Sequence, residues 1–313
     1  MDGTEPKIEI FEPFGVAYGV MKKILFQPFD LSKWLVIGFA AFLAGSWGSG
    51  FQGRIPSGNW NVKSTSYNHA PISESLPPWL MPFLFVIIVA IVVLALVFAW
   101  ISARGRFIFL DCVVKNRPAI VAPWKEYRRE GNSFFLFCLV VGLLGFVVVV
   151  GLALLVAVPL GVFSGGKMTG GLGVAAICVI IFLGLVWVVF LIIFAVATQF
   201  MVPVMYRRRC RAREAFATVW ALIRNQPGPF VLFVLFGIVL ALALVVVGGV
   251  FACMTCCIAG LPYVSSVVML PAFVWLLAFK LLFLRQFGPE YDVWLAADPA
   301  SPEPPLPEPP AEG

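Results

Sequence analysis

The 313 residues are enough for two soluble domains, but the composition excludes a soluble protein. Hydrophobic residues make up 61% of the chain and charged residues 12%, against roughly 45–50% and about 25% in ordinary globular proteins. The net charge is +6 and the mean hydropathy is +0.98. The same numbers exclude a disordered protein, a disulfide-rich secreted module and a nucleic-acid-binding domain.

Residues 1–32 are predicted to form a cytoplasmic N-terminal segment with one interfacial helix. Phe14, Tyr18 and Met21 are spaced so that they share one face of a helix. The segment has no compact apolar core followed by a small-residue cleavage site. We therefore expect no cleavable signal peptide, and we expect the first span to serve as the anchor.

Residues 33–287 are predicted to form a membrane domain with six spans. A helical span needs about 20 mostly apolar residues to cross a hydrocarbon core roughly 30 Å thick. Six stretches qualify: Lys33–Phe51, Trp79–Ser102, Phe134–Phe163, Leu172–Met205, Phe230–Cys257 and Tyr263–Leu284. The apolar runs are continuous rather than alternating, which favours helices over a membrane barrel. The expected fold class is all-α, a polytopic membrane protein with six transmembrane helices.

The basic residues predict how these spans are threaded. Nearly all of the 22 lysines and arginines lie before the first span, after the second, after the fourth or at the end of the sixth. The exceptions are Arg54, Lys63 and Lys167. Because basic residues are retained in the cytoplasm, this distribution predicts a multi-pass protein of the cell (inner) membrane with both termini cytoplasmic.

The two large basic loops contain a repeat. Ala119, Trp124, Arg128, Phe134 and Phe137 recur at the same spacing as Ala215, Trp220, Arg224, Phe230 and Phe233. In each loop an aromatic stripe falls on one helical face and basic residues fall on others, as in a short amphipathic helix that lies in the membrane interface. With the N-terminal segment, this predicts three units of an interfacial helix followed by a two-span hairpin.

Two observations limit the repeat. Pro123 is unfavourable in a helix interior, so the first loop's helix is expected to begin there and to lose Ile120 from its stripe. The alternative is that Trp and Arg are simply common at inner interfaces.

If the repeat holds, these loops contact anionic lipid headgroups. The residues predicted to make such contacts are Trp124, Arg128, Arg129, Arg207, Arg208, Arg209, Trp220 and Arg224.

No catalytic, cofactor-binding or metal site is predicted. His69 is the single histidine, and none of the common hydrolase, P-loop or dinucleotide motifs occurs in a suitable context. Cys253, Cys256 and Cys257 form a cluster without a fourth zinc ligand nearby. We interpret them as small packing residues, with a disulfide as the alternative. Residues 288–313 are rich in Pro and Glu and are predicted to form a disordered cytoplasmic tail.

Several segments carry a family resemblance. They are Gln27–Trp34, Phe200–Met205, Glu214–Phe216, Trp220–Ile223 and Asn225–Phe230. Together they resemble the membrane domain found in some bacterial glycerophosphodiester phosphodiesterases and in related uncharacterised six-span proteins. The resemblance covers the layout of residues 10–285 and leaves no room for the catalytic phosphodiesterase domain. It implies a standalone membrane domain, and no active-site residue is carried over.

These observations predict a non-enzymatic membrane protein that organises lipid or a partner at the cytoplasmic leaflet. The expected partners are anionic lipid headgroups on the cytoplasmic side and a protein partner or a second copy of the chain, with no nucleic acid. The alternative is a small transporter or flippase-like protein, although the predicted spans lack the midplane charges typical of a transport pathway. An intramembrane enzyme is a third hypothesis.

Overall fold

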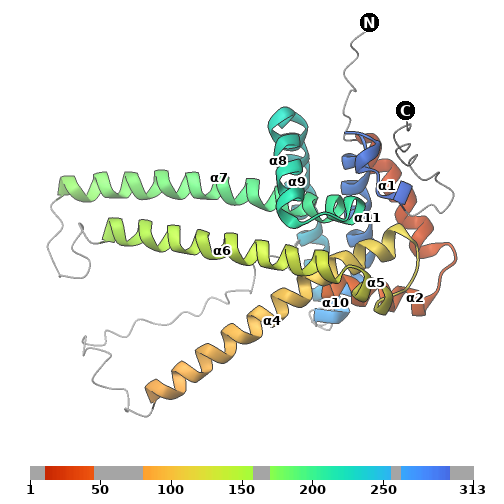
Figure 1. Cartoon of the computed structure of the whole chain (residues 1–313), viewed down its shortest axis with the longest axis horizontal. Coiled ribbons are helices and arrows are strands. Elements are labelled where there is room, and N and C mark those ends of the chain that lie inside the picture. The colour runs from red at the N-terminus through yellow and green to blue at the C-terminus, as the bar shows by residue number, and fades with distance from the viewer. Residues whose placement is uncertain (1–10, 46–79, 158–169, 255–261, 297–313) are drawn as a thin grey trace, which may run out of the picture.

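The computed structural model describes residues 11–45, 80–157, 170–254 and 262–296, and every regular element in these ranges is a helix (Figure 1). The prediction of an all-α fold is therefore confirmed for the described part of the chain.

Four of the helices are long and apolar enough to cross a membrane. They are α4 (Leu80–Val114), α6 (Arg128–Ala157), α7 (Gly170–Arg208) and α9 (Pro227–Met254). They correspond to the predicted second to fifth spans. Their most apolar stretches contact few other residues: in α4, Phe83 is 57% exposed and Phe98 is likewise 57% exposed. Such a surface is unfavourable in water and suits a lipid environment, which identifies a membrane protein.

These helices continue well beyond the length that a bilayer requires. α4 has 35 residues and is therefore roughly 52 Å long, against about 30 Å for a hydrocarbon core. It does not end near Ser102, as predicted, but runs on to Val114, so Arg104 and Arg106 lie within the helix rather than in a loop. Helical backbone satisfies its own hydrogen bonds, and the added turns bury their apolar side chains against neighbouring helices.

The buried core lies at one end of the long helices. It combines Ala103–Val114 of α4 and Ala197–Tyr206 of α7 with α1 (Phe11–Phe26), α2 (Leu31–Leu43) and α11 (Leu270–Arg285). The largest side chains with almost no exposed surface include Phe107, Phe134, Phe200 and Phe283. In Figure 1, α4, α6 and α7 extend away from this cluster of shorter helices.

The first and sixth predicted spans are not confirmed. The first corresponds to α2, a 13-residue helix whose N-terminus is capped by Asp30, since Oδ1 accepts a 2.8 Å hydrogen bond from the Ser32 amide. The sixth corresponds to α10 (Pro262–Val268) and α11, which are separated at Met269. Six spans therefore remain a prediction, of which four have matching helices.

The two repeated loops fold differently. The first contains α5 (Val121–Glu126), and Arg128 already begins α6; the second contains α8 (Ala212–Asn225), which includes Arg224. Pro123 lies in the first turn of α5, where its missing N–H costs little. The three-unit repeat stays a prediction.

The beginning of the predicted tail packs onto the helices. Two short 3-10 helices, η3 (Pro289–Tyr291) and η4 (Trp294–Ala296), follow α11. Tyr291 and Val293 are buried in the core. The folded part of the chain thus extends past residue 288, and residues 297–313 of the predicted tail lie outside the described residues.

Candidate functional site

Side-chain contacts bring the four basic regions of the chain together at one end of the molecule. Lys33 donates a 2.7 Å hydrogen bond to Asn116 Oδ1, which joins the start of α2 to the loop after α4. Arg209 forms an ion pair with Glu126, and Arg208 forms one with Glu290 at 2.8 Å. We call this the basic end. The grouping that the sequence predicted is thus present in the structure.

Arg104 is the centre of a polar cluster between α4 and α6. Its Nε and Nη2 atoms donate hydrogen bonds of 3.0 and 2.8 Å to Asn132 Oδ1. The indole Nε1 of Trp100, one helical turn before Arg104, donates to the same oxygen at 3.0 Å. Because Asn132 belongs to α6, this oxygen joins the two long helices where they approach each other.

Two tryptophan rings enclose the Arg104 guanidinium. Its Cζ atom lies 4.3 Å from the centre of the Trp100 ring and 5.1 Å from that of Trp124. The two rings meet edge to face, with centroids 5.9 Å apart. Arg104 is only 6% exposed, and cation–π contacts contribute about 2 kcal/mol when the cation is desolvated. The cation is therefore held in place by neutral groups, and its charge is not neutralised.

An open cationic pocket lies beside this cluster. It has a volume of about 310 Å³ and is lined by Trp100, Arg104, Trp124, Lys125 and Arg128. Lys125 and Arg128 are exposed. The pocket therefore collects three cations from α4, α5 and α6, and none of its lining residues is acidic. The surface that these residues turn into the pocket is almost entirely carbon, so an ion pair with a phosphate or carboxylate group there would depend on the exposed ends of Lys125 and Arg128.

The structure separates the eight predicted lipid-contact residues into groups. Trp124 and Arg128 line the cationic pocket. Arg129 and Arg224 are exposed, and Trp220 is 44% exposed and stacks on Phe216 within α8 at 6.2 Å. Trp124 is half-buried and packs against the core, whereas Arg128, Arg129, Trp220 and Arg224 have exposed side chains; contact of these five residues with lipid stays a prediction.

The three arginines at the end of α7 do not form one set. Arg208 bonds to Glu290 and lies 5.2 Å from the centre of the Tyr291 ring. Arg209 bonds to Glu126 and to the hydroxyl of Tyr127, and lies 4.0 Å from the centre of that ring. Arg207 is half-buried and has no such partner among the described residues. Arg208 and Arg209 therefore join elements of the protein while remaining exposed, and their contact with lipid stays a prediction.

A buried carboxylate network at the basic end was missed by the sequence analysis. The Asp111 side chain has no exposed surface and forms ion pairs with Lys115 at 2.7 Å and Arg117 at 3.1 Å. The hydrogen bond to Asp111 raises the pKa of Arg117. Asp111 is the single acid of α4, a signal that was available but was overlooked because the predicted span ended at Ser102.

Tyrosines extend this network toward α5 and α7. Tyr206 donates to Asp111 Oδ1 at 2.9 Å and stacks on Tyr127, with ring centroids 4.9 Å apart. Tyr127 stacks in turn on Phe107 at 6.0 Å. Burial raises the pKa of Tyr127, so its hydroxyl stays neutral and hydrogen-bonding. The network joins α4, α5 and α7 at the basic end.

Within residues 11–45, 80–157, 170–254 and 262–296, no three His, Cys, Asp or Glu side chains are close enough together to hold a metal ion. His69, Cys256 and Cys257 lie outside the described residues, and nothing is described of the Cys253 side chain.

Comparison with known proteins gives one match. A family model described as "Family of unknown function (DUF7544)" matches residues 9–288. No curated protein and no solved structure matches the chain.

Proposed function

This chain belongs to the Family of unknown function (DUF7544), and we propose that it is a non-enzymatic membrane protein that holds anionic lipid, or a protein partner, at the cytoplasmic leaflet. The observation that carries the proposal is the cationic pocket, in which Arg104, Lys125 and Arg128 converge without an acidic lining residue. Each basic residue near an anionic membrane surface contributes about 1 kcal/mol of attraction.

The proposed location is the inner membrane, with the basic end in the cytoplasm. Basic residues are retained on that side during insertion, and the contacts of Lys33, Arg208 and Arg209 support a single basic end. The described residues nearest the chain ends belong to α1 and η4, which pack at the same end. This arrangement supports cytoplasmic termini.

Six membrane crossings remain part of the proposal. α2 starts at the basic end, because Lys33 contacts Asn116 just beyond the end of α4. Ser102 of α4 donates a hydrogen bond to the carbonyl oxygen of Ala44, at the end of α2. Leu80 lies about 33 Å of helix before Ser102, so α4 starts at the opposite end. α9 likewise leaves the basic end, and α11 ends there, where Phe283 packs on Phe230. These relations fit one crossing by α2 and two by α9 with α10 and α11, which together with α4, α6 and α7 make six.

The interfacial helices are proposed lipid contacts as well. α8 buries Ala212, Ala215 and Val219 against the protein and leaves Trp220 and Arg224 exposed. An exposed tryptophan and arginine on an amphipathic helix are typical of the headgroup region. The resemblance to phosphodiesterase membrane domains is compatible with this role, because it implies no reaction for the membrane domain itself.

The test is a double charge reversal, Arg128→Glu with Arg224→Glu. Both residues are exposed, so we expect the variant to fold. The purified full-length protein should retain several-fold less anionic phospholipid than the wild type, measured by lipid mass spectrometry, and recover less of any cross-linked partner. Unchanged lipid retention and partner recovery would contradict the proposal. A water-accessible path through the bundle, mapped by cysteine labelling, would instead favour a transporter.

A further inference from the structure

We propose that α4 and α6 together bind one anionic phospholipid molecule, with its phosphate in the cationic pocket and an acyl chain in an adjacent apolar groove. This inference rests on the proposed function and adds the place, the stoichiometry and the chemistry of the ligand.

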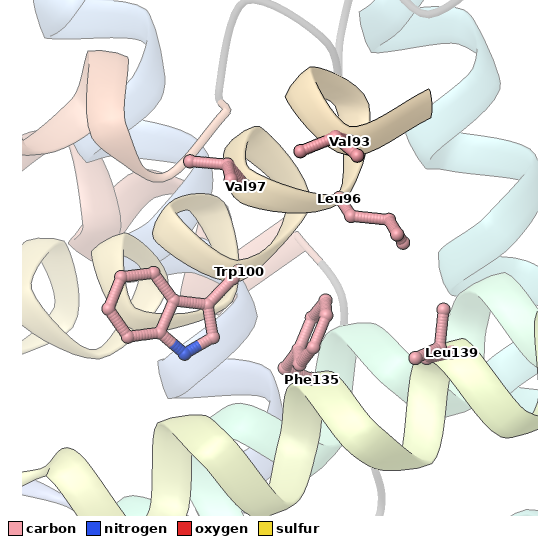
Figure 2. Close-up of a pocket in the computed structure, with 6 residues that line it drawn as sticks. All are labelled: Val93, Leu96, Val97, Trp100, Phe135 and Leu139. Carbon is pink, nitrogen blue, oxygen red and sulfur yellow. The ribbon is translucent and has the colours of Figure 1, made fainter. Parts of the chain in front are cut away.

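The apolar groove lies between the two long helices, toward their lipid-exposed ends. It has a volume of about 370 Å³ and is lined by Val93, Leu96, Val97, Trp100, Phe135 and Leu139. The four residues from α4 are spaced at i, i+3, i+4 and i+7 and therefore share one helical face. In Figure 2 the side chains of Leu96, Phe135 and Leu139 point into the space between α4 and α6.

Trp100 joins this apolar groove to the cationic pocket, because it lines both. Leu96, Trp100 and Arg104 follow one another at intervals of four residues on α4. Each interval corresponds to a rise of about 6 Å along the helix. An apolar wall, an indole ring and a cation thus succeed one another over about 12 Å. The same order of acyl chain, interfacial region and phosphate occurs along a phospholipid.

The charges at the cationic pocket fit a phosphate. Arg104 uses Nε and Nη2 for Asn132, and its Nη1 has no partner among the described residues. Lys125 and Arg128 add two exposed cations. Guanidinium groups form paired, charge-assisted hydrogen bonds with phosphate oxygens. A zwitterionic headgroup brings its own cation to the site, so the pocket should favour an anionic lipid.

Where α4 and α6 separate, their surfaces require an apolar neighbour. Leu96 is 40% exposed and Leu139 is 39% exposed, although both line the apolar groove. The two helices meet near α5 and separate toward their other ends (Figure 1). A soluble anion would occupy the cationic pocket alone and would make no contact with this apolar surface. A lipid satisfies both parts of the site at once.

The experiment is native mass spectrometry of the full-length protein in detergent, titrated separately with phosphatidylglycerol, which is anionic, and phosphatidylcholine, which is zwitterionic. We expect one tightly bound phosphatidylglycerol and weaker binding of phosphatidylcholine. Inorganic phosphate at millimolar concentration should not displace the lipid. Melting temperatures of all variants are measured in parallel, so that misfolding is recognised.

Two pairs of variants test the two parts of the site. Lys125→Gln with Arg128→Gln should weaken binding of phosphatidylglycerol about 30-fold. The control Lys22→Gln with Lys23→Gln removes the same charge from exposed positions of α1 and should bind as the wild type does. Leu96→Trp fills the apolar groove and should abolish the single tight site. Its control, Ile91→Trp, lies on the opposite face of α4 and is 59% exposed in the wild type.

The outcomes separate this inference from the proposed function. The two-part lipid site would be overturned by any one of three results. These are binding of phosphatidylglycerol by Leu96→Trp as tight as by the wild type, equal affinity of the wild type for the two lipids, and displacement of the bound lipid by phosphate alone. If that happened while Arg128→Glu with Arg224→Glu still reduced the retained anionic lipid, the proposed function would stand without this site. If the charge reversal also had no effect, both would be wrong.

Discussion

The hydroxyl of Tyr206 donates a 2.9 Å hydrogen bond to a carboxylate oxygen of Asp111, across 95 residues of sequence. The contact joins α7 to α4 at the basic end, and Asp111 has no exposed surface. A hydrogen bond to a buried charged group is stronger than one between neutral groups, because little water competes for it. This pair therefore fixes the relative positions of two long helices.

We expect Tyr206→Phe to lower the free energy of unfolding by about 1.5–3 kcal/mol, because it removes the hydroxyl from a buried carboxylate and leaves the ring stack on Tyr127. Thermal unfolding in detergent, followed by circular dichroism, measures the change. Tyr18→Phe is the matched control, since Tyr18 is 54% exposed and retains its ring contact with Trp275. Equal melting temperatures for the two variants would contradict the structural role of the Asp111 bond.

The close approach of α2 to α4 depends on Gly105. A Cβ atom at this position would lie 2.4 Å from the backbone carbonyl atoms of Leu43, and backbone cannot move aside as a flexible side chain can. Gly105→Ala should therefore destabilise the protein by about 1–3 kcal/mol.

Gly142 of α6 provides the control for this substitution, because a Cβ atom there meets nothing within 4 Å. Gly142→Ala should be neutral or should stabilise by up to about 1 kcal/mol through helix propensity. A chemical-denaturation series in detergent compares the two variants. A Gly105→Ala protein as stable as Gly142→Ala would show that α2 does not pack this closely on α4.

Arg207 and Arg209 should behave differently when replaced by alanine. Arg209 pairs with Glu126 and lies over the Tyr127 ring, but its side chain is 43% exposed, so solvent screening limits its contribution to about 1 kcal/mol. Arg207→Ala should change stability by less than about 0.5 kcal/mol. Melting temperatures of the two variants test this order, and the reverse order would contradict the assignment of Arg209 to the packing between α5 and α7.

Trp220 should lie at headgroup depth. Its side chain is 44% exposed on an amphipathic helix with Arg224 nearby, and tryptophan prefers the membrane–water interface. In vesicles, the fluorescence of Trp220 is obtained as the difference between the wild type and the Trp220→Phe variant. Lipids brominated close to the headgroup should quench this fluorescence most. Maximal quenching by a water-soluble quencher, or by lipids brominated near the chain ends, would contradict an interfacial α8.

Much of the fold could be predicted from the sequence, and less of the candidate site. The second to fifth predicted spans have matching helices, and the basic regions meet as their distribution indicated. Trp124 and Arg128 line the cationic pocket, and the predicted contact of both residues with lipid stays a prediction. Trp100 and Arg104 were not among the predicted contacts, because the predicted second span ended at Ser102 and Arg104 was assigned to the following loop.

Helix boundaries were the weaker part of the prediction. Equal spacing of Trp124–Arg128 and Trp220–Arg224 predicted a short interfacial helix in each loop, with the first beginning at Pro123, but the first helix ends before Tyr127 and the second before Gln226. The difference follows from packing: Tyr127 is buried between the rings of Phe107 and Tyr206, a contact that no local spacing reveals.

The sequence by itself determined that this is a membrane protein, that its described part is helical, and that the second to fifth predicted spans are long and apolar enough to cross. It could do so because a bilayer imposes length and apolar composition on each segment separately. Only the tertiary structure decided that Asp111 is enclosed by Tyr206, Lys115 and Arg117, and that Trp100 joins an apolar groove to a cationic pocket. Such contacts depend on where distant segments meet, and that is set by the packing of whole helices rather than by any local pattern.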